Sequence, residues 1–300
     1  MQEFLQQLVN GISWGSIYAL IALGYTMVYG VLQLINFAHG DVFMLGAFFG
    51  YFFSRWTHIS SHPTPIGFLA VLCFTMAACA LVGMLIERAA YRPLRARPRL
   101  TVLITAIGVS LLLENGGQLI FGADPKFFPT LVVERKLYDS PNLVISNHSL
   151  TVLGVALGLM VFLQFIVHRT RMGKAMRAVA FNREAASLMG IPIDHVISFT
   201  FALGSALAGA GAILVATTYP KIDPLMGLLP GLKAFVAAVL GGIGSIPGAM
   251  LGGLILGVAE TMVSGYLSST FRDAIAFALL VVILIVKPTG ILGHRAGEKV

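Results

Sequence analysis

Long apolar runs separated by short polar segments repeat along this chain of 300 residues. A helix needs about 20 consecutive apolar residues to cross a bilayer, and a long uninterrupted run predicts such a helix. The runs fall at 11–35, 38–54, 66–87, 101–121, 150–168, 193–218, 232–264 and 272–287. The pattern therefore predicts an all-α polytopic membrane protein with about eight transmembrane segments.

The run at 232–264 is too long for one span and contains its own interruption, the sequence GGIGSIPG at 241–248. Glycine lowers helix stability by about 1 kcal/mol and proline by about 3 kcal/mol. We therefore expect a broken or re-entrant helical hairpin here, made of two shorter helices. A similar break, NFAHGD at 36–41, separates the first two runs. Irregular backbone at membrane depth survives only where protein or water satisfies its polar groups.

The composition agrees with a lipid environment, since 57% of the residues are hydrophobic and only 11% are charged. Soluble domains carry about 25% charged residues, so this chain cannot cover a globular surface with polar side chains. A large domain outside the membrane is excluded, and residues 1–300 are expected to form one transmembrane domain in the lipid bilayer. The net charge of +7 is interpreted as an indication of membrane topology and not of nucleic-acid binding, because in membrane proteins the location of Lys and Arg matters most.

Ten of the 20 basic residues lie in two short segments, 88–100 and 169–183. Cytoplasmic loops carry an excess of Lys and Arg, so we place both segments in the cytoplasm. The C-terminal end, with Lys287, Arg295 and Lys299, belongs on the same side. The segments expected outside are 1–10, 55–65, the longer loop at about 122–149, and 219–231. With the segments assigned to these sides, residues 232–264 must begin and end outside, which also favours a hairpin there.

The second basic segment continues into an alanine-rich stretch, so that the cytoplasmic loop extends over about 169–192. Gly190 and Pro192 follow this stretch and predict that a short helix ends there. On a helical period the apolar stripe comprises Ala178, Phe181, Ala185 and Leu188, with Arg177 and Glu184 at its border. Such a face needs either a protein partner or the membrane surface, where basic residues would hold an interfacial helix on the lipid headgroups.

Two sets of residues resemble a known family. Glu184-Ala185-Ala186, followed after three residues by Gly190, resembles the EAA…G core with which ABC importer permeases dock onto their ATPase subunits. The Leu-Pro that often follows this core is not apparent here. Segments 35–47 and 240–249 resemble the LivH-type permease family of high-affinity branched-chain amino acid importers. This likeness extends from Gly15 to Gly290.

The resemblance implies the inner-membrane permease subunit of a bacterial ABC transporter that imports branched-chain amino acids. It implies two ATPase subunits, a second permease subunit that is a homologue, and a periplasmic substrate-binding protein, which would dock on the external loops. The sequence contains no phosphate-binding G-x-x-x-x-G-K-[ST] motif, no metal-ligand cluster and no paired nucleophile and base. We therefore expect no enzymatic activity and no cofactor, with ATP hydrolysis left to the partners.

Three alternatives stay open. Related permeases transport urea or short amides, so the resemblance constrains the substrate less than it constrains the type of transporter. A secondary carrier coupled to protons or ions would use a titrating intramembrane glutamate and would need no ATPase. A membrane scaffold without transport activity is the third alternative. The EAA…G core argues against the last two.

Candidate residues of a translocation path lie at the two breaks and at two intramembrane carboxylates. Transporters use the free polar groups of broken helices to hold charged substrates near the membrane midplane. The candidates are Asn36, His39 and Asp41 at the first break, Gly242, Gly244 and Ser245 at the second, and Glu114 and Glu260 within spans. Alternatively, the first break is a turn in which Asp41 caps the following helix, and the glutamates bond to nearby backbone. Buried acids in lipid usually face the protein interior.

Small residues recur four positions apart, which is the spacing at which two helices can cross closely. The pairs are Gly11 and Gly15, Gly46 and Gly50, Gly154 and Gly158, Gly248 and Gly252, and Gly253 and Gly257. They predict a compact bundle with close backbone crossings.

Overall fold

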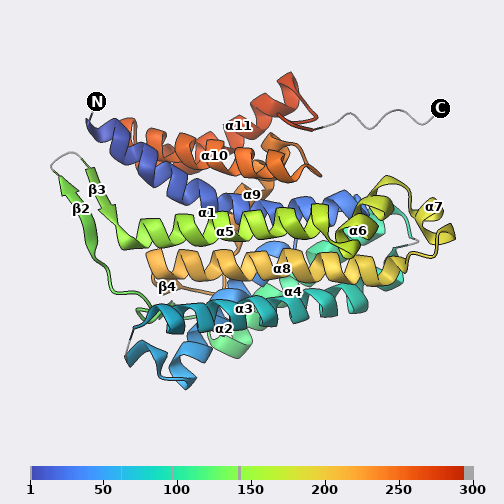
Figure 1. Cartoon of the computed structure of the whole chain (residues 1–300), viewed down its shortest axis with the longest axis horizontal. Coiled ribbons are helices and arrows are strands. Elements are labelled where there is room, and N and C mark those ends of the chain that lie inside the picture. Colours follow the sequence, from blue (N-terminus) through green and yellow to red (C-terminus); the bar gives the residue numbers. More distant parts are fainter. Residues whose placement is uncertain (1, 62, 96, 141–142, 294–300) are drawn as a thin grey trace.

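The computed structural model describes residues 2–61, 63–95, 97–140 and 143–293, so the expected cytoplasmic Arg295 and Lys299 lie outside the described residues. Long helices lie side by side along the long axis of the molecule (Figure 1). They are α1 (Gln2–Leu32), α2 (His39–Trp56), α3 (Pro65–Ile86), α4 (Arg99–Phe121), α5 (Asn147–Arg169), α8 (Ile193–Thr218), α9 (Leu228–Gly241), α10 (Ile246–Tyr266) and α11 (Arg272–Val286). The predicted all-α polytopic fold is confirmed.

Seven helical segments in the described part of the chain are long and apolar enough to cross a membrane. The expected count of about eight is not confirmed, because α2 and α9, the latter formed by the first part of the run 232–264, are not among these seven segments. The helix α2 has 18 residues and carries His39, Asp41 and Arg55 near its ends. The helix α9 has only 14 residues, whereas a span needs about 20.

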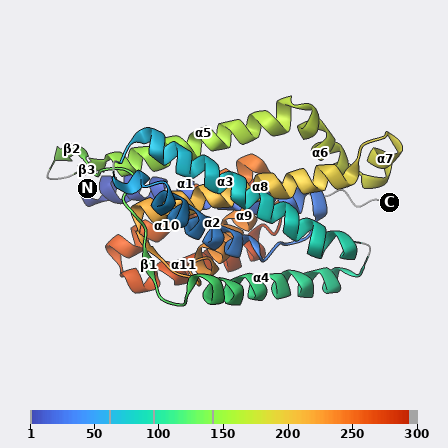
Figure 2. The same cartoon turned by 90° about the horizontal axis from the view of Figure 1, so that it is seen from below.

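The helices α1 and α8 form the centre of the bundle, and both are mostly buried, whereas α4 and α11 are largely exposed to the surroundings. Figure 2 shows α4 and α5 on opposite sides of the molecule, with the central helices between them. Peripheral helices expose apolar side chains such as Leu112 and Ile285. In a bilayer, such side chains contact lipid without cost, which explains why the outer helices are apolar all round.

The first break returns the chain into the bundle. The helix α1 ends at Leu32, and α2 begins at His39, whose Nε2 lies 3.1 Å from the carbonyl oxygen of Ile21. Ile21 is about three turns before the end of α1, so α2 starts roughly 16 Å back along that helix. The irregular segment therefore covers 33–38, earlier than the predicted 36–41, and His39 and Asp41 belong to the first turn of α2.

The second break divides the run at 232–264 into α9 and α10, as predicted. Gly242 and Gly244 adopt φ angles of 109° and 93°, a region that glycine enters at little cost. Ser245 then caps α10 by accepting a hydrogen bond from the Gly248 N–H at 3.2 Å. The beginning of the hairpin differs from the prediction, because α9 starts at Leu228 instead of 232.

The first turns of α2 and α9 meet inside the bundle. Gly40 lies so close to Gly227 and Gly231 that a Cβ atom at any of these positions would collide with backbone. At its other end α9 leads to Gly244, which lies beside Gly30 near the end of α1. From one level within the bundle, α2 therefore runs toward the end expected outside, and α9 runs toward the end expected in the cytoplasm.

Glycines bring α1 and α10 into direct backbone contact. A Cβ atom on Gly15 would collide with Leu254, and one on Gly253 would collide with Ala19. Close approach of this kind supplies the van der Waals contact that holds helices together in lipid. The pair Gly154 and Gly158 on α5 differs, since a Cβ atom there would meet nothing within 4 Å.

Short strands lie at the end of the molecule opposite α6 and α7, and form part of the expected external loops (Figure 1). The strand β1 (Lys126–Phe127) pairs antiparallel with β4 (Lys221–Ile222) and so joins the loops at 122–149 and 219–231. The strands β2 (Lys136–Ser140) and β3 (Leu143–Ser146) form an antiparallel hairpin. The hairpin is tied to α1, because the Val144 N–H donates to Oε1 of Gln6 at 2.8 Å.

Candidate functional site

The expected cytoplasmic helix is two helices, α6 (Arg171–Phe181) and α7 (Arg183–Leu188). The prediction of one continuous helix was wrong because Asn182 has extended backbone, with φ −155° and ψ 111°. Its side chain accepts a hydrogen bond from the Ala185 N–H at 3.1 Å and caps α7. The helix ends where the sequence predicts, since Gly190 has a φ of 78° just beyond α7.

A cluster of exposed residues, named here the coupling surface, covers α7 and the end of α6. It comprises Phe181, Glu184, Ala185, Leu188 and Met189. Phe181 and Leu188 are each 88% exposed, and Met189 is 82% exposed. The coupling surface lies at one extreme end of the long axis of the molecule (Figure 1). Exposed apolar side chains of this size indicate a surface that another protein or a membrane covers.

Two of the other predicted residues of this loop are less exposed, whereas Gly190 is exposed. Ala186 is buried, and Ala178 is half-buried. The Arg177 guanidinium donates to the carbonyl oxygen of Val167 near the end of α5. The helix-terminal carbonyl groups of α5 carry partial negative charge, which favours an arginine there.

Arg183 fixes α7 to the central helix. Its Nη2 donates to the carbonyl oxygen of Val31, in the last turn of α1, at 3.0 Å. Burial lowers the pKa of the Arg183 guanidinium from its usual value. The coupling surface is therefore carried by a segment that is bound to both α1 and α5.

An ion cluster at the start of α8 was missed in the sequence. Asp194 pairs with Arg92 and with Nη1 of Arg95, the latter at 2.7 Å. Arg95 also pairs with Glu87, which is fully buried and accepts a hydrogen bond from the Ser198 hydroxyl. The sequence contains a signal for this cluster. Asp194 follows the basic segment 169–183, and the positive-inside rule places that segment on the same side of the membrane as the basic segment 88–100.

The polar side chains of the first break form hydrogen bonds with other residues of the chain. Asn36 is buried and accepts a hydrogen bond from the Tyr91 hydroxyl at 2.8 Å. His39 bonds to the Ile21 carbonyl, and its ring lies edge-on against Tyr25 with 4.5 Å between centroids. These contacts fix the return of the chain into the bundle, and the role of Asn36 and His39 in a path stays a prediction.

The alternative interpretation, in which Asp41 caps α2, is wrong. The N-cap position is Ala38, which has no capping side chain. The Asp41 carboxylate instead accepts a hydrogen bond from the Ser110 hydroxyl of α4. Glu114 lies one turn further along α4 and is half-buried. The structure thus brings together two of the predicted acidic residues from separate helices.

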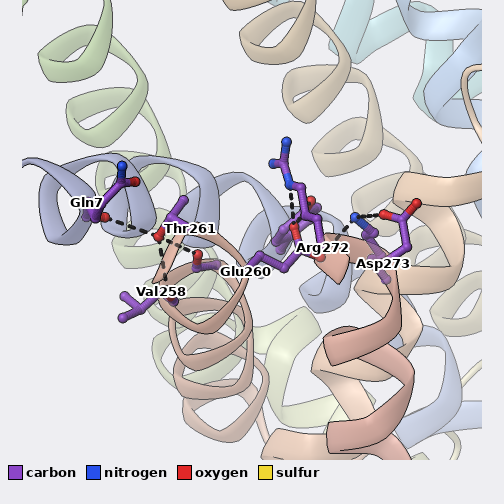
Figure 3. Close-up of polar contacts among 9 residues, drawn as sticks. Gln7, Val258, Glu260, Thr261, Arg272 and Asp273 are labelled. Carbon is purple, nitrogen blue, oxygen red and sulfur yellow. Dashed lines mark hydrogen bonds and ion pairs between the residues drawn. The ribbon is translucent and has the colours of Figure 1, made fainter. Parts of the chain in front are cut away.

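Glu260 is the buried centre of an ionic network between α1, α9, α10 and α11 (Figure 3). Its carboxylate accepts hydrogen bonds from the Tyr18 hydroxyl at 2.9 Å and from Nε of Arg272 at 3.1 Å. Its other oxygen lies 2.9 Å from Nζ of Lys233, which in turn is 2.6 Å from Asp273. The network contains two positive and two negative side chains, so its formal charges cancel. Buried charges are tolerated when they are paired in this way.

Sequence reasoning missed Lys233 in this network. It lies inside the apolar run 232–264 and its side chain is only 6% exposed. A charged residue within a span is itself a signal, because it is costly in lipid unless it is paired. The same signal had identified Glu260 without identifying its partner.

The second break borders a cavity of about 750 Å³ near the cytoplasmic end of α1, named here the inner cavity. Gly244 and Ser245 line it from the second break, Gln33 lines it from the irregular segment after α1, and Arg177 lines it from α6. Gly242 does not line it and packs against the backbone of Gly290. The structure therefore brings Gly244 and Ser245 together with the beginning of the first irregular segment and with α6, but the cavity is not lined by Asn36, His39, Asp41 or Glu260.

The described ranges contain no group of three or more His, Cys, Asp or Glu side chains arranged to hold a metal ion. The clustered charges that they do contain pair with one another, as around Glu87 and Glu260.

A family model described as the permease component of branched-chain amino acid transport systems matches residues 7–284. The chain is 43% identical to the high-affinity branched-chain amino acid transport system permease protein BraD of Pseudomonas aeruginosa, over 99% of this chain and 98% of that protein. It is 44% identical to the corresponding protein LivH of Escherichia coli, with the same coverage. Among solved structures, PsaBC from Streptococcus pneumoniae is similar with a TM-score of 0.48 and 11% identity, over 93% of this chain and 91% of that one.

Proposed function

Because the chain belongs to the family of permease components of branched-chain amino acid transport systems, we propose that it forms the translocation path of an ATP-driven importer for branched-chain amino acids. It is a multi-pass inner-membrane protein. The observation that carries the proposal is the coupling surface, an exposed apolar patch that contains the Glu184-Ala185-Ala186 core at one end of the bundle. Such a surface suits docking onto an ATPase subunit.

The proposed complex contains two ATPase subunits, a second and homologous permease subunit, and a periplasmic substrate-binding protein. The chain itself performs no covalent chemistry in this scheme, and it binds no nucleic acid. The substrate-binding protein would dock on the external loops, where the β2–β3 hairpin presents Glu134, Arg135 and Lys136 near its base. Charges of both signs suit a docking interface that is polar at its rim.

The contacts of α6 and α7 support a mechanical role. Arg183 joins α7 to α1, and Asp194 joins the start of α8 to the loop that follows α3. A displacement of the coupling surface is therefore transmitted to three helices of the bundle. A ligand or partner can shift a conformational equilibrium only through contacts that differ between the two states, and this hydrogen bond and this ion pair are such contacts in the proposed mechanism.

The contacts of Glu260 support a structural role over that of the coupling residue of a secondary carrier. Lys233 and Arg272 both contact the carboxylate, so that Glu260 joins α10 to α9 and α11. The assignment to branched-chain amino acids, instead of urea or short amides, is supported by the relatives.

The test is reconstitution of this chain with its co-encoded ATPases, second permease and binding protein in proteoliposomes. We expect ATP-dependent uptake of labelled leucine, isoleucine and valine, with no effect of collapsing an ion gradient. An ATPase that binds but does not hydrolyse ATP is the control and should abolish uptake. Uptake that continues without ATPase subunits would contradict the proposal, and competition by urea or acetamide, but not by leucine, would reassign the substrate.

A further inference from the structure

The helix α4 is attached to the rest of the bundle along one side. This inner side packs on α2, where the Ser110 hydroxyl donates to Asp41 and the ring of Phe121 stacks on Phe48 with 4.5 Å between centroids. The opposite side is exposed along the length of the helix, and Figure 2 shows α4 at one edge of the molecule. The uncovered side of α4 therefore faces either lipid or another protein within the membrane.

Six residues on the uncovered side form two series with a spacing of seven, and we name them together the outer seam. They are Thr101, Gly108 and Asn115 in the first series, and Ile104, Leu111 and Gln118 in the second. All are exposed except Gln118, which is half-buried. Two series of this spacing, offset by three residues, form the contact line between paired helices in coiled coils, and many membrane bundles pack in the same geometry.

The outer seam contains a polar group that lipid does not satisfy. Asn115 lies five residues from Ser110, the middle of α4, which is about 8 Å along the helix and within the hydrocarbon core, whose half-thickness is about 15 Å. Its amide nitrogen donates to the carbonyl oxygen of Leu111 in its own helix at 2.7 Å, and within the described residues its amide oxygen accepts no hydrogen bond. Amide side chains in membrane helices bond across to a neighbouring helix, because lipid offers no partner.

The exposed surfaces of two other peripheral helices differ from that of α4. Residues 152–163 of α5 and 274–286 of α11 contain no polar side chain. Lipid is therefore sufficient to cover the middle of α5 and nearly all of α11. The outer seam of α4 instead requires a protein neighbour at membrane depth.

Gly108 allows another helix to approach the centre of the outer seam closely. A Cβ atom on Gly108 would meet nothing within 4 Å, so within the described residues no helix of this chain uses that space. Gly15 and Gly253 differ, since the crossing of α1 and α10 depends on their missing Cβ atoms. A small residue on an exposed membrane helix lets the backbones of two helices come into contact.

We propose that the outer seam is the surface on which the second permease subunit packs, with the corresponding helix of that subunit lying along α4. This inference rests on the proposed function and adds an interface to it. The ATPase subunits and the substrate-binding protein of the proposed complex lie outside the bilayer. The second permease subunit is therefore the partner in that complex that covers a surface at the depth of Asn115.

The likeness of the two permease subunits fixes the geometry of this contact. Two homologous subunits around a two-fold axis along the membrane normal present the same helix in the same direction. Gly108 and Asn115 then lie close to the corresponding positions of the partner. A single polar residue in such a seam sets the register of the two helices, which is the role of Asn115 in this arrangement.

The first test is photocrosslinking of the complete complex in membranes, with p-benzoylphenylalanine in place of one residue at a time. Leu111 is the test position, and Phe162 of α5 is the matched control, because these side chains are 53% and 57% exposed on helices at opposite sides of the molecule (Figure 2). We expect an adduct with the epitope-tagged second permease subunit from position 111 and none from position 162. The proposal is overturned if position 111 gives no such adduct, or if it links two copies of this chain instead.

The second test compares Gly108→Leu with Gly154→Leu, since both glycines have open space around an added Cβ atom. The measurement is the amount of second permease subunit that co-purifies per molecule of this chain. We expect Gly108→Leu to lower it about tenfold, which corresponds to about 1.4 kcal/mol of association free energy, and Gly154→Leu to leave it unchanged. Asn115→Leu should lower it as well, whereas a surface that faces lipid would tolerate this change.

Wild-type co-purification of both Gly108→Leu and Asn115→Leu would overturn the interface. Both tests measure subunit contact and require no transport. A complex that imports leucine with ATP but shows no contact at the outer seam contradicts this inference alone. A complex that is joined at the outer seam but imports no branched-chain amino acid contradicts the proposed function alone.

Discussion

Asp194, in the first turn of α8, is bound by Arg95 from the loop after α3, with 2.7 Å between Oδ1 and Nη1. Burial lowers the pKa of the Arg95 guanidinium, and the adjacent Asp194 opposes this shift. Because α7 leads into α8 through only four residues, in the proposed function this pair would transmit a displacement of the coupling surface from the start of α8 to the loop after α3.

The first prediction concerns this pair. Asp194→Asn should leave the protein folded, since Asp194 is half-exposed, but should lower the amount of leucine imported per ATP hydrolysed. The measurement is the ratio of uptake to phosphate release in proteoliposomes. Arg97→Ala, an exposed residue of the same loop, is the control and should leave the ratio unchanged. Equal ratios for wild type and Asp194→Asn would remove the pair from the coupling route.

Arg95→Ala should behave differently from Asp194→Asn, because it leaves the fully buried Glu87 without its cation. Removal of one partner of a buried pair costs about 3 kcal/mol or more. We expect a lower unfolding temperature in detergent and reduced accumulation in the membrane. A double substitution, Arg95→Ala with Glu87→Gln, should recover part of the loss. If the single variant unfolds at the wild-type temperature, Glu87 does not depend on Arg95.

The coupling surface gives the third prediction. Ala185→Asp places a charge in the centre of an exposed apolar patch, so insertion and folding should be normal while ATPase docking is lost. Co-purification of the ATPase subunits and uptake of leucine are the measurements. Ser187→Asp, which is exposed on another side of α7, serves as the matched control. Wild-type uptake by Ala185→Asp would show that another surface binds the ATPase.

The fourth prediction concerns the crossing of α1 and α10. Gly253→Ala should destabilise the protein by about 1 to 3 kcal/mol, because the new Cβ atom would collide with the backbone of Ala19. Gly154→Ala adds the same atom where space is open and should have little effect or stabilise α5 slightly. Thermal unfolding of the two variants in the same detergent distinguishes them. Equal destabilisation would mean that the crossing tolerates a wider separation.

The sequence was sufficient to predict the features that depend on local pattern. Apolar runs located the long helices, and the glycines at 242 and 244 located the second break, because an unbroken helix there would be costly. The continuous cytoplasmic helix was predicted wrongly, since asparagine differs from a good helix former by less than about 1 kcal/mol. The capping hydrogen bond that the Ala185 N–H donates to the Asn182 side chain decides the outcome, and no periodicity reveals it.

The pairing of charges could not be predicted for a different reason. Tyr18 and Glu260 are 242 positions apart, and their contact depends on which helices adjoin α1. A single sequence shows that Glu260 and Lys233 each need a partner in lipid. It does not show that they are partners of each other.

The meeting of α2 and α9 at Gly40, Gly227 and Gly231 has a consequence for how the bundle can change shape. One continuous helix transmits a tilt at one membrane face to the other face. Two half-length helices whose first turns cross at glycine backbone can change their angle there without breaking any of their internal hydrogen bonds. In the proposed transporter this would allow the two ends of the bundle to change shape at different times, which is the requirement for moving a solute without ever leaving a hole in the membrane.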